Sequence, residues 1–97
     1  MARRLIWSKR AEDIFNKILQ FYIDRNGSKN YSRKLNNQIK KLTLALIKNP
    51  FLGKPTSKKS IRILIKGDFK IIYQVNNKEI IILLVWNSRQ SPKNIKM

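Results

Sequence analysis

The fold is decided by residues 61–86, IRILIKGDFKIIYQVNNKEIIILLVW, in which short turn sequences separate three apolar segments. The segments are Ile61–Lys66, Phe69–Val75 and Ile80–Trp86, and the turns contain Gly67-Asp68 and Asn76-Asn77. β-Branched and aromatic residues between such dipeptides predict β-hairpins, so we expect an antiparallel meander of three strands. The last segment has no polar residue from Ile80 to Trp86, which indicates a central strand covered at least partly on both sides.

The side chains of a strand alternate between its two faces, and this alternation predicts two unlike sheet faces. One face is expected to be wholly apolar and to form the core, with Ile61, Ile63, Ile65, Phe69, Ile71, Tyr73 and Val75. The opposite face is expected to be a shallow basic groove in which cations lie among aliphatic side chains. Its predicted residues are Arg62, Leu64, Lys70 and Ile72.

Two amphipathic helices are predicted before the meander. Residues 3–7 read as a short strand, Ser8 is a suitable N-cap, and Gly27 can end the first helix. Ser28 can cap a second helix, which Pro50 stops, and a loop follows to residue 60. In both helices apolar residues recur at i, i+3, i+4 and i+7, which gives each helix one apolar face.

These elements predict an α+β fold with two layers. The helical hairpin covers one face of the antiparallel β-meander, and the N-terminal strand joins the sheet beside Ile80–Trp86. We expect one domain over residues 1–97, with residues 90–97 as a loose tail.

The composition points to a polyanionic partner. The 97 residues contain 22 Lys+Arg against 5 Asp+Glu, for a formal charge of +17, and the cations are spread along the whole chain. Without cysteine there is no disulfide framework, which suits a reducing compartment. The apolar runs are too short for a signal peptide or a membrane-spanning helix, so we expect a cytoplasmic protein without a membrane partner.

Most catalytic chemistry is excluded by the residue types. No histidine is present, and the carboxylates are few and scattered, so we expect no metal and no cofactor. Arginine and lysine can still stabilise the charge on a phosphate. If the protein is an enzyme, it is therefore expected to be a metal-independent endoribonuclease, because RNA supplies its own 2′-OH nucleophile. A purely binding role needs no such group.

Three phrases carry a resemblance to a known family: Asn49-Pro50-Phe51-Leu52-Gly53, Phe69–Val75, and Trp86-Asn87-Ser88-Arg89-Gln90-Ser91-Pro92. In their order and spacing the chain resembles the RelE/ParE superfamily of bacterial toxins. The resemblance implies the RelE/ParE-like fold and the toxin half of a type II toxin-antitoxin system, whose acidic antitoxin neutralises it and binds operator DNA.

The resemblance leaves the target open. RelE-like toxins cleave mRNA on the ribosome, and Arg62, Lys70 and Arg89 match three of their cationic positions. Leu64 and Ile95 stand where a second lysine and a tyrosine of that catalytic set would be. These departures favour a ParE-like toxin, or a plasmid-stabilisation relative, that inhibits growth through DNA gyrase. The alternatives are a RelE-type endoribonuclease, a toxin that has lost activity, and a non-toxic basic nucleic-acid-binding module.

The same residues are the predicted binding surface. We expect Arg62, Leu64, Lys70, Ile72 and Arg89 to contact the antitoxin or the target. If the toxin is a ribonuclease, Arg62, Lys70 and Arg89 are the candidates for catalysis.

Overall fold

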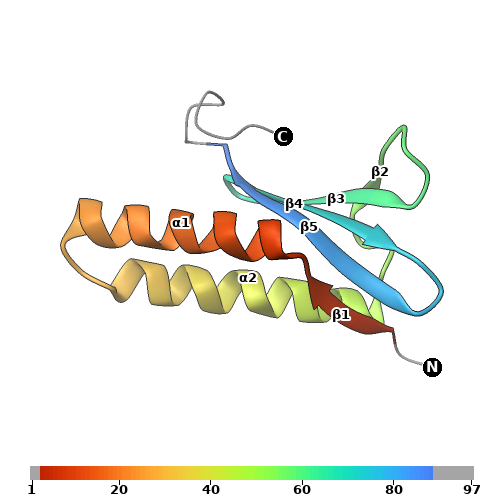
Figure 1. Cartoon of the computed structure of the whole chain (residues 1–97), viewed down its shortest axis with the longest axis horizontal. Helices are drawn as coiled ribbons and strands as arrows, with labels where there is room; N and C mark the ends of the chain where they lie inside the picture. The colour runs from red at the N-terminus through yellow and green to blue at the C-terminus, as the bar shows by residue number, and fades with distance from the viewer. Residues whose placement is uncertain (1–2, 89–97) are drawn as a thin grey trace.

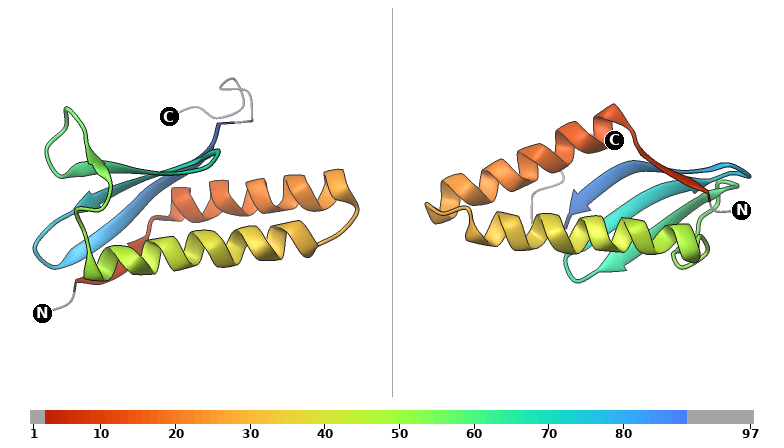
Figure 2. Two further views of the ribbon diagram at one scale, coloured as in Figure 1. Left: turned by 180° about the vertical axis from the view of Figure 1, so that it is seen from behind. Right: turned by 90° about the horizontal axis from the view of Figure 1, so that it is seen from below.

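The computed structural model describes residues 3–88, which form two helices and five strands in two layers. Figure 1 shows α1 and α2 side by side beneath the sheet, and the view from below in Figure 2 shows α2 crossing in front of the strands while most of α1 extends beyond them. Arg89, Ile95 and the predicted tail at 90–97 lie outside the described residues. The elements are β1 (Arg4–Trp7), α1 (Lys9–Asn26), α2 (Asn30–Lys48), β2 (Lys54–Pro55), β3 (Ile61–Lys66), β4 (Phe69–Val75) and β5 (Glu79–Asn87).

The strand order is β1-β5-β4-β3-β2, with β1 parallel to β5 and the other neighbours antiparallel. The predicted meander is therefore confirmed, as is the N-terminal strand beside the last one. Strand β5 is central, in agreement with its lack of polar residues between Ile80 and Trp86. Strand β2 was not predicted, because its two residues include a proline and lie inside the expected loop.

The helix ends follow local chemistry. Ser8 is the N-cap of α1, and its hydroxyl accepts a hydrogen bond from the Ala11 amide at 3.0 Å. Gly27 ends α1 with φ of 65°, a left-handed conformation that glycine adopts at little cost. The predicted cap of α2 was one residue early: α2 begins at Asn30 after Lys29, while the Ser28 hydroxyl accepts from the Asn30 amide.

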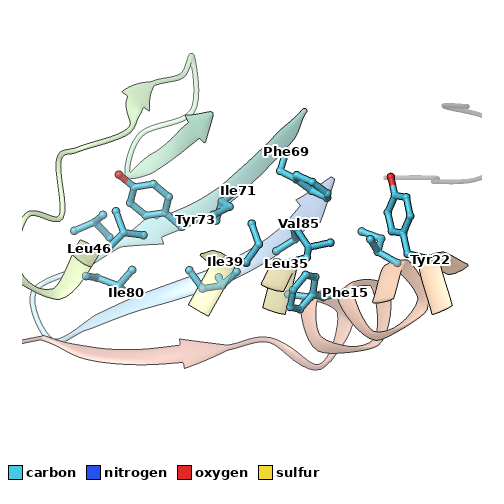
Figure 3. Packing of buried hydrophobic residues seen from close by; sticks show 14 residues of the cluster. Phe15, Tyr22, Leu35, Ile39, Leu46, Phe69, Ile71, Tyr73, Ile80 and Val85 are labelled. Atoms are coloured by element: carbon cyan, nitrogen blue, oxygen red, sulfur yellow. The ribbon is translucent and has the colours of Figure 1, made fainter. Parts of the chain in front are cut away.

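The core lies between the helices and the sheet. Figure 3 shows side chains of α1 and α2 meeting those of β4 and β5. The positions predicted for the core on β4, Phe69, Ile71, Tyr73 and Val75, are all buried. The other buried hydrophobic residues of this cluster are Ala11, Phe15, Ile18, Tyr22, Leu35, Ile39, Leu46, Ile80, Ile82 and Val85.

The predicted faces of β3 were reversed. Lys66 is paired with Phe69 across the two-residue turn, so these two residues share a sheet face. Because side chains alternate along β3, Ile61, Ile63 and Ile65 lie on the face away from the helices, which is called the outer face from here on. Arg62 and Leu64 lie on the helix side. The prediction put the apolar positions of β3 and β4 on one face because it did not include the pairing of Lys66 with Phe69 across the turn.

A β-bulge changes the alternation in β5. Ile72 is opposite Leu84 while Tyr73 is opposite Ile82, which leaves Leu83 as the extra residue. Beyond it, Trp86 is paired with Lys70 on the outer face, and Asn87 is buried on the helix side. The Asn87 amide donates a hydrogen bond to the Tyr22 hydroxyl at 2.6 Å.

Candidate functional site

The residues predicted to form one basic groove lie on two faces of the sheet. Arg62 is opposite Tyr73 and Leu64 is opposite Ile71, so both lie on the helix side, where Leu64 packs against the core. Lys70 and Ile72 lie on the outer face, opposite Ile65 and Ile63. The prediction of a single groove is wrong, because the turn between β3 and β4 fixes the opposite register.

The Arg62 guanidinium is held by backbone carbonyls. Its Nη1 donates to the Gly53 oxygen at 2.6 Å and lies 3.4 Å from the Phe51 oxygen. The guanidinium carbon lies over the Phe51 ring, 4.9 Å from its centroid, within the range of a cation–π interaction. Arg62 is thereby fixed at the start of β3, against the segment that leaves α2.

That segment is fastened to the sheet by Tyr73. The Gly53 amide donates to the Tyr73 hydroxyl at 2.8 Å, and the hydroxyl donates to the Pro50 carbonyl, also at 2.8 Å. Gly53 is needed because a Cβ there would lie 2.8 Å from the Ile63 carbonyl oxygen and from the Tyr73 ring. Burial raises the pKa of the Tyr73 hydroxyl above its ordinary value, so Tyr73 is neutral at physiological pH and serves as a structural tie.

Next to this tie lies an open pocket of about 500 Å³, called the Phe51 pocket from here on. Arg3 enters it from the start of the chain: its Nε donates to the Asn76 carbonyl at 2.7 Å, and its guanidinium carbon lies 5.9 Å from the Phe51 ring centroid. The lining residues are Arg3, Phe51, Pro55, Thr56, Lys58, Lys59, Ser60, Ile61, Arg62, Val75, Asn76 and Asn77.

The Phe51 pocket is strongly positive. Arg3, Lys58, Lys59 and Arg62 line it, no aspartate or glutamate does, and none of the four forms an ion pair with a carboxylate of residues 3–88. Phe51 itself is 58% exposed. An exposed aromatic ring among uncompensated cations is an arrangement suited to an anionic ligand that also has a flat or apolar part.

Sequence reasoning missed this pocket. Arg62 was singled out, but Lys58 and Lys59 were counted only among the cations spread along the chain, and Arg3 was assigned only to the first strand. Phe51, in the phrase that carried the family resemblance, was the available signal, because a large aromatic residue between Pro50 and Gly53 has no helical or strand face on which to be buried.

The outer face is a second candidate surface, because it is rich in aliphatic residues. Ile65 is 52% exposed, while Ile63 and Ile72 are half-buried. The Lys70 ammonium lies 5.8 Å from the centroid of the Trp86 ring. The Trp86 indole N–H is buried and has no hydrogen-bond acceptor within the described part of the chain.

Neither a metal site nor a membrane span occurs in the described residues. No group of three or more histidine, cysteine, aspartate or glutamate side chains in residues 3–88 could hold a metal ion. Neither α1 nor α2 is long and apolar enough to cross a bilayer.

Three solved structures share the fold. The chromosomal ParDE toxin-antitoxin system of P. aeruginosa matches with a TM-score of 0.76 and 23% identity, over 89% of this chain and 96% of that one. The RelBE2 toxin-antitoxin complex of Mycobacterium tuberculosis matches with a TM-score of 0.68 and 13% identity, over 90% and 99%. The E. coli DinJ-YafQ toxin-antitoxin complex matches with a TM-score of 0.59 and 15% identity, over 92% and 96%.

The sequence comparisons identify the family. No curated protein matches the chain by sequence. The family model of the ParE toxin of type II toxin-antitoxin systems, parDE, matches residues 5–92, which is nearly the whole chain. The chain therefore belongs to the ParE family of toxins of type II toxin-antitoxin systems.

Proposed function

We propose that this ParE-family toxin arrests bacterial growth by inhibiting DNA gyrase in the cytoplasm, and that an acidic antitoxin neutralises it. The alternative within the superfamily is cleavage of mRNA on the ribosome. A metal-independent ribonuclease needs several cations around one scissile phosphate to stabilise the developing charge.

The placement of Arg62 and Lys70 on opposite sides of the sheet is the observation that carries the proposal. A strand pair separates two side chains that point to opposite faces, so these two cations cannot converge on one phosphate group. Arg62 is moreover held by the carbonyls of Phe51 and Gly53. The separation supports inhibition by binding over catalysis of RNA cleavage.

Leu64 and Tyr73 support the same choice. Leu64 stands where a second lysine of the catalytic set would be, and it packs against the core. Tyr73 is buried and makes hydrogen bonds to both Gly53 and Pro50, so it is not free to move a substrate proton. A toxin with this arrangement acts through the surfaces it presents to its target.

The acidic antitoxin is assigned to the outer face. A domain with a formal charge of +17 attracts an anionic partner, and the three solved neighbours are components of toxin-antitoxin systems. The half-exposed Ile65 and the Lys70 ammonium offer apolar and cationic contacts on one face. These contacts fit an amphipathic acidic segment that becomes ordered on binding.

The target is tested with purified toxin and purified gyrase. We expect a concentration-dependent loss of negative supercoiling of a relaxed plasmid, and no effect on relaxation by topoisomerase I, which serves as the control. Expression in bacteria should stop growth at the same time. Growth arrest with unimpaired gyrase would contradict the proposal, and the absence of both effects would indicate an inactive toxin.

The antitoxin surface is tested with two exposed aliphatic residues. Ile65→Asp introduces a charge on the outer face, whereas Leu44→Asp does so on α2, where Leu44 is 56% exposed. We expect Ile65→Asp to raise the dissociation rate of the co-expressed antitoxin at least about tenfold, as loss of an interface anchor does, and Leu44→Asp to leave it unchanged. The opposite result would place the antitoxin on the helices.

A further inference from the structure

We propose that the Phe51 pocket binds one nucleotide of a single-stranded nucleic acid, with Arg3 and Arg62 on its phosphate and the base stacked beside Phe51. This binding site shares only Ile61 with the outer face, and it does not depend on the proposed action on gyrase. The argument rests on the fixed position of the two guanidinium groups, the polar groups around them and the exposed ring.

The two guanidinium groups are positioned before any ligand arrives. Each is held by backbone carbonyls, Arg3 by Asn76 and Arg62 by Gly53, and both lie within 6 Å of the Phe51 ring centroid. A carbonyl is neutral, so these hydrogen bonds orient the guanidinium groups without cancelling their charge. Because arginine has five N–H donors, each group keeps donors for the oxygens of a phosphate.

The rest of the lining suits a nucleotide. A volume of about 500 Å³ lies in the range of pockets that hold small ligands. Lys58 and Lys59 add charge at the rim, and Ser60 and Asn77 supply hydroxyl and amide groups. These are the side-chain types that contact phosphate and sugar in complexes with nucleic acids.

The exposed ring favours an unpaired strand. Phe51 is 58% exposed, and aromatic rings and arginine planes bind bases by stacking. In a duplex the faces of the bases are covered by their neighbours, so a paired base cannot reach the ring. An acidic peptide could satisfy the cations, but its carboxylates cannot stack on the exposed part of the Phe51 ring, so the nucleic acid is favoured over the peptide.

Cleavage of the bound strand is not expected. Arg62 is in the pocket, but Lys70 lies on the outer face. The pocket lining also contains no carboxylate and no histidine that could act as a general base, so its cations serve to bind a phosphate.

The test is fluorescence anisotropy of a labelled strand of twelve deoxythymidines with the full-length toxin, at several salt concentrations. A uridine strand of the same length and a twelve-base-pair duplex are compared with it, and poly-L-glutamate is the competitor. The variants are Arg3→Gln/Arg62→Gln, Lys58→Gln/Lys59→Gln and Phe51→Leu. The charge-matched control is Arg33→Gln/Lys34→Gln, two exposed residues near the start of α2, at the end of the hairpin far from β1 and β2.

We expect micromolar binding of both single strands and weaker binding of the duplex. Because both guanidinium groups are placed on one phosphate, Arg3→Gln/Arg62→Gln should reduce the magnitude of the slope of log K against log salt by about 0.7. Phe51→Leu should weaken binding about tenfold at an unchanged slope, because it removes stacking and no charge. The control should keep both the wild-type slope, within error, and most of the affinity.

The variants Lys58→Gln/Lys59→Gln and Phe51→Leu alter exposed side chains, so they remain informative if Arg62→Gln impairs folding. Equal losses in the control and the pocket variants would overturn the proposal, since the attraction would then be diffuse. Tighter binding of the duplex than of the single strands would also overturn it. The same holds if poly-L-glutamate binds through the pocket and the single strands do not compete with it.

Discussion

Replacing Tyr73 by phenylalanine removes the one hydroxyl that fastens the segment after α2 to the sheet. Two buried partners lose their hydrogen bond: the Gly53 amide, which donates to the hydroxyl, and the Pro50 carbonyl, which accepts from it, each at 2.8 Å. A buried polar group left without a partner costs about 1–3 kcal/mol, so the variant should lose about 3 kcal/mol of the free energy of unfolding. In a domain of this size that corresponds to a fall in melting temperature of roughly 12–24 °C.

The assay is chemical denaturation followed by tryptophan fluorescence, with thermal melting as a second measurement. Tyr31→Phe is the matched control, because Tyr31 is 41% exposed and water can replace whatever contact its hydroxyl makes. That control should change the free energy of unfolding by less than about 0.5 kcal/mol. A Tyr73→Phe variant as stable as the control would show that the tie between Pro50, Gly53 and Tyr73 does not hold the segment in place.

Three further predictions concern the same contacts. Gly53→Ala should destabilise the fold by about 1–3 kcal/mol in denaturant melts, because its Cβ would lie 2.8 Å from the backbone oxygen of Ile63. A double-mutant cycle with Tyr22→Phe and Asn87→Ala should give a coupling energy of about 1 kcal/mol, since the two side chains share a buried hydrogen bond of 2.6 Å; additive losses would refute that coupling. The raised pKa of Tyr73 means that the folded state holds this proton more tightly than the unfolded state. Its contribution to stability is therefore complete below a pH of about 10 and falls at higher pH, so the stability difference between the wild type and Tyr73→Phe should shrink in alkaline titrations.

The elements were predictable because each one begins and ends with a local signal. Ser8 and Gly27 have the side-chain and backbone properties that fix the two ends of α1, and the sequence between them is amphipathic. The position of β5 between two other strands followed from its composition, since no residue from Ile80 to Trp86 is polar. These signals depend only on residues that are close in sequence. The helices and the meander were therefore predicted correctly.

The faces of the sheet were wrong for a reason that the sequence does contain. The Gly67-Asp68 turn pairs Lys66 with Phe69, and this one pairing decides the face of every residue in β3. The prediction placed the isoleucines of β3 on the apolar face of β4, which would bury the most apolar surface. That placement needs a strand register that a two-residue turn does not allow. The structure instead packs a partly buried Leu64 against the core and leaves Ile65 about half exposed.

The Phe51 pocket could not be predicted from local patterns. It brings together Arg3 from the start of the chain, the segment after α2, the start of β3 and the turn between β4 and β5. Those segments are distant in sequence and meet only because β1 joins the sheet beside β5. Three-dimensional proximity of that kind depends on strand order and register together.

The most direct test of the central claim is to assay one preparation of purified toxin on gyrase and on ribosomes programmed with mRNA. If the cations of β3 and β4 serve binding and not catalysis, the toxin should abolish supercoiling at a concentration that leaves ribosome-bound mRNA intact. Codon-positioned cleavage at that concentration, lost in Arg62→Gln or in Lys70→Gln, would contradict the account, because it would require both residues to reach one phosphate from opposite faces of the sheet.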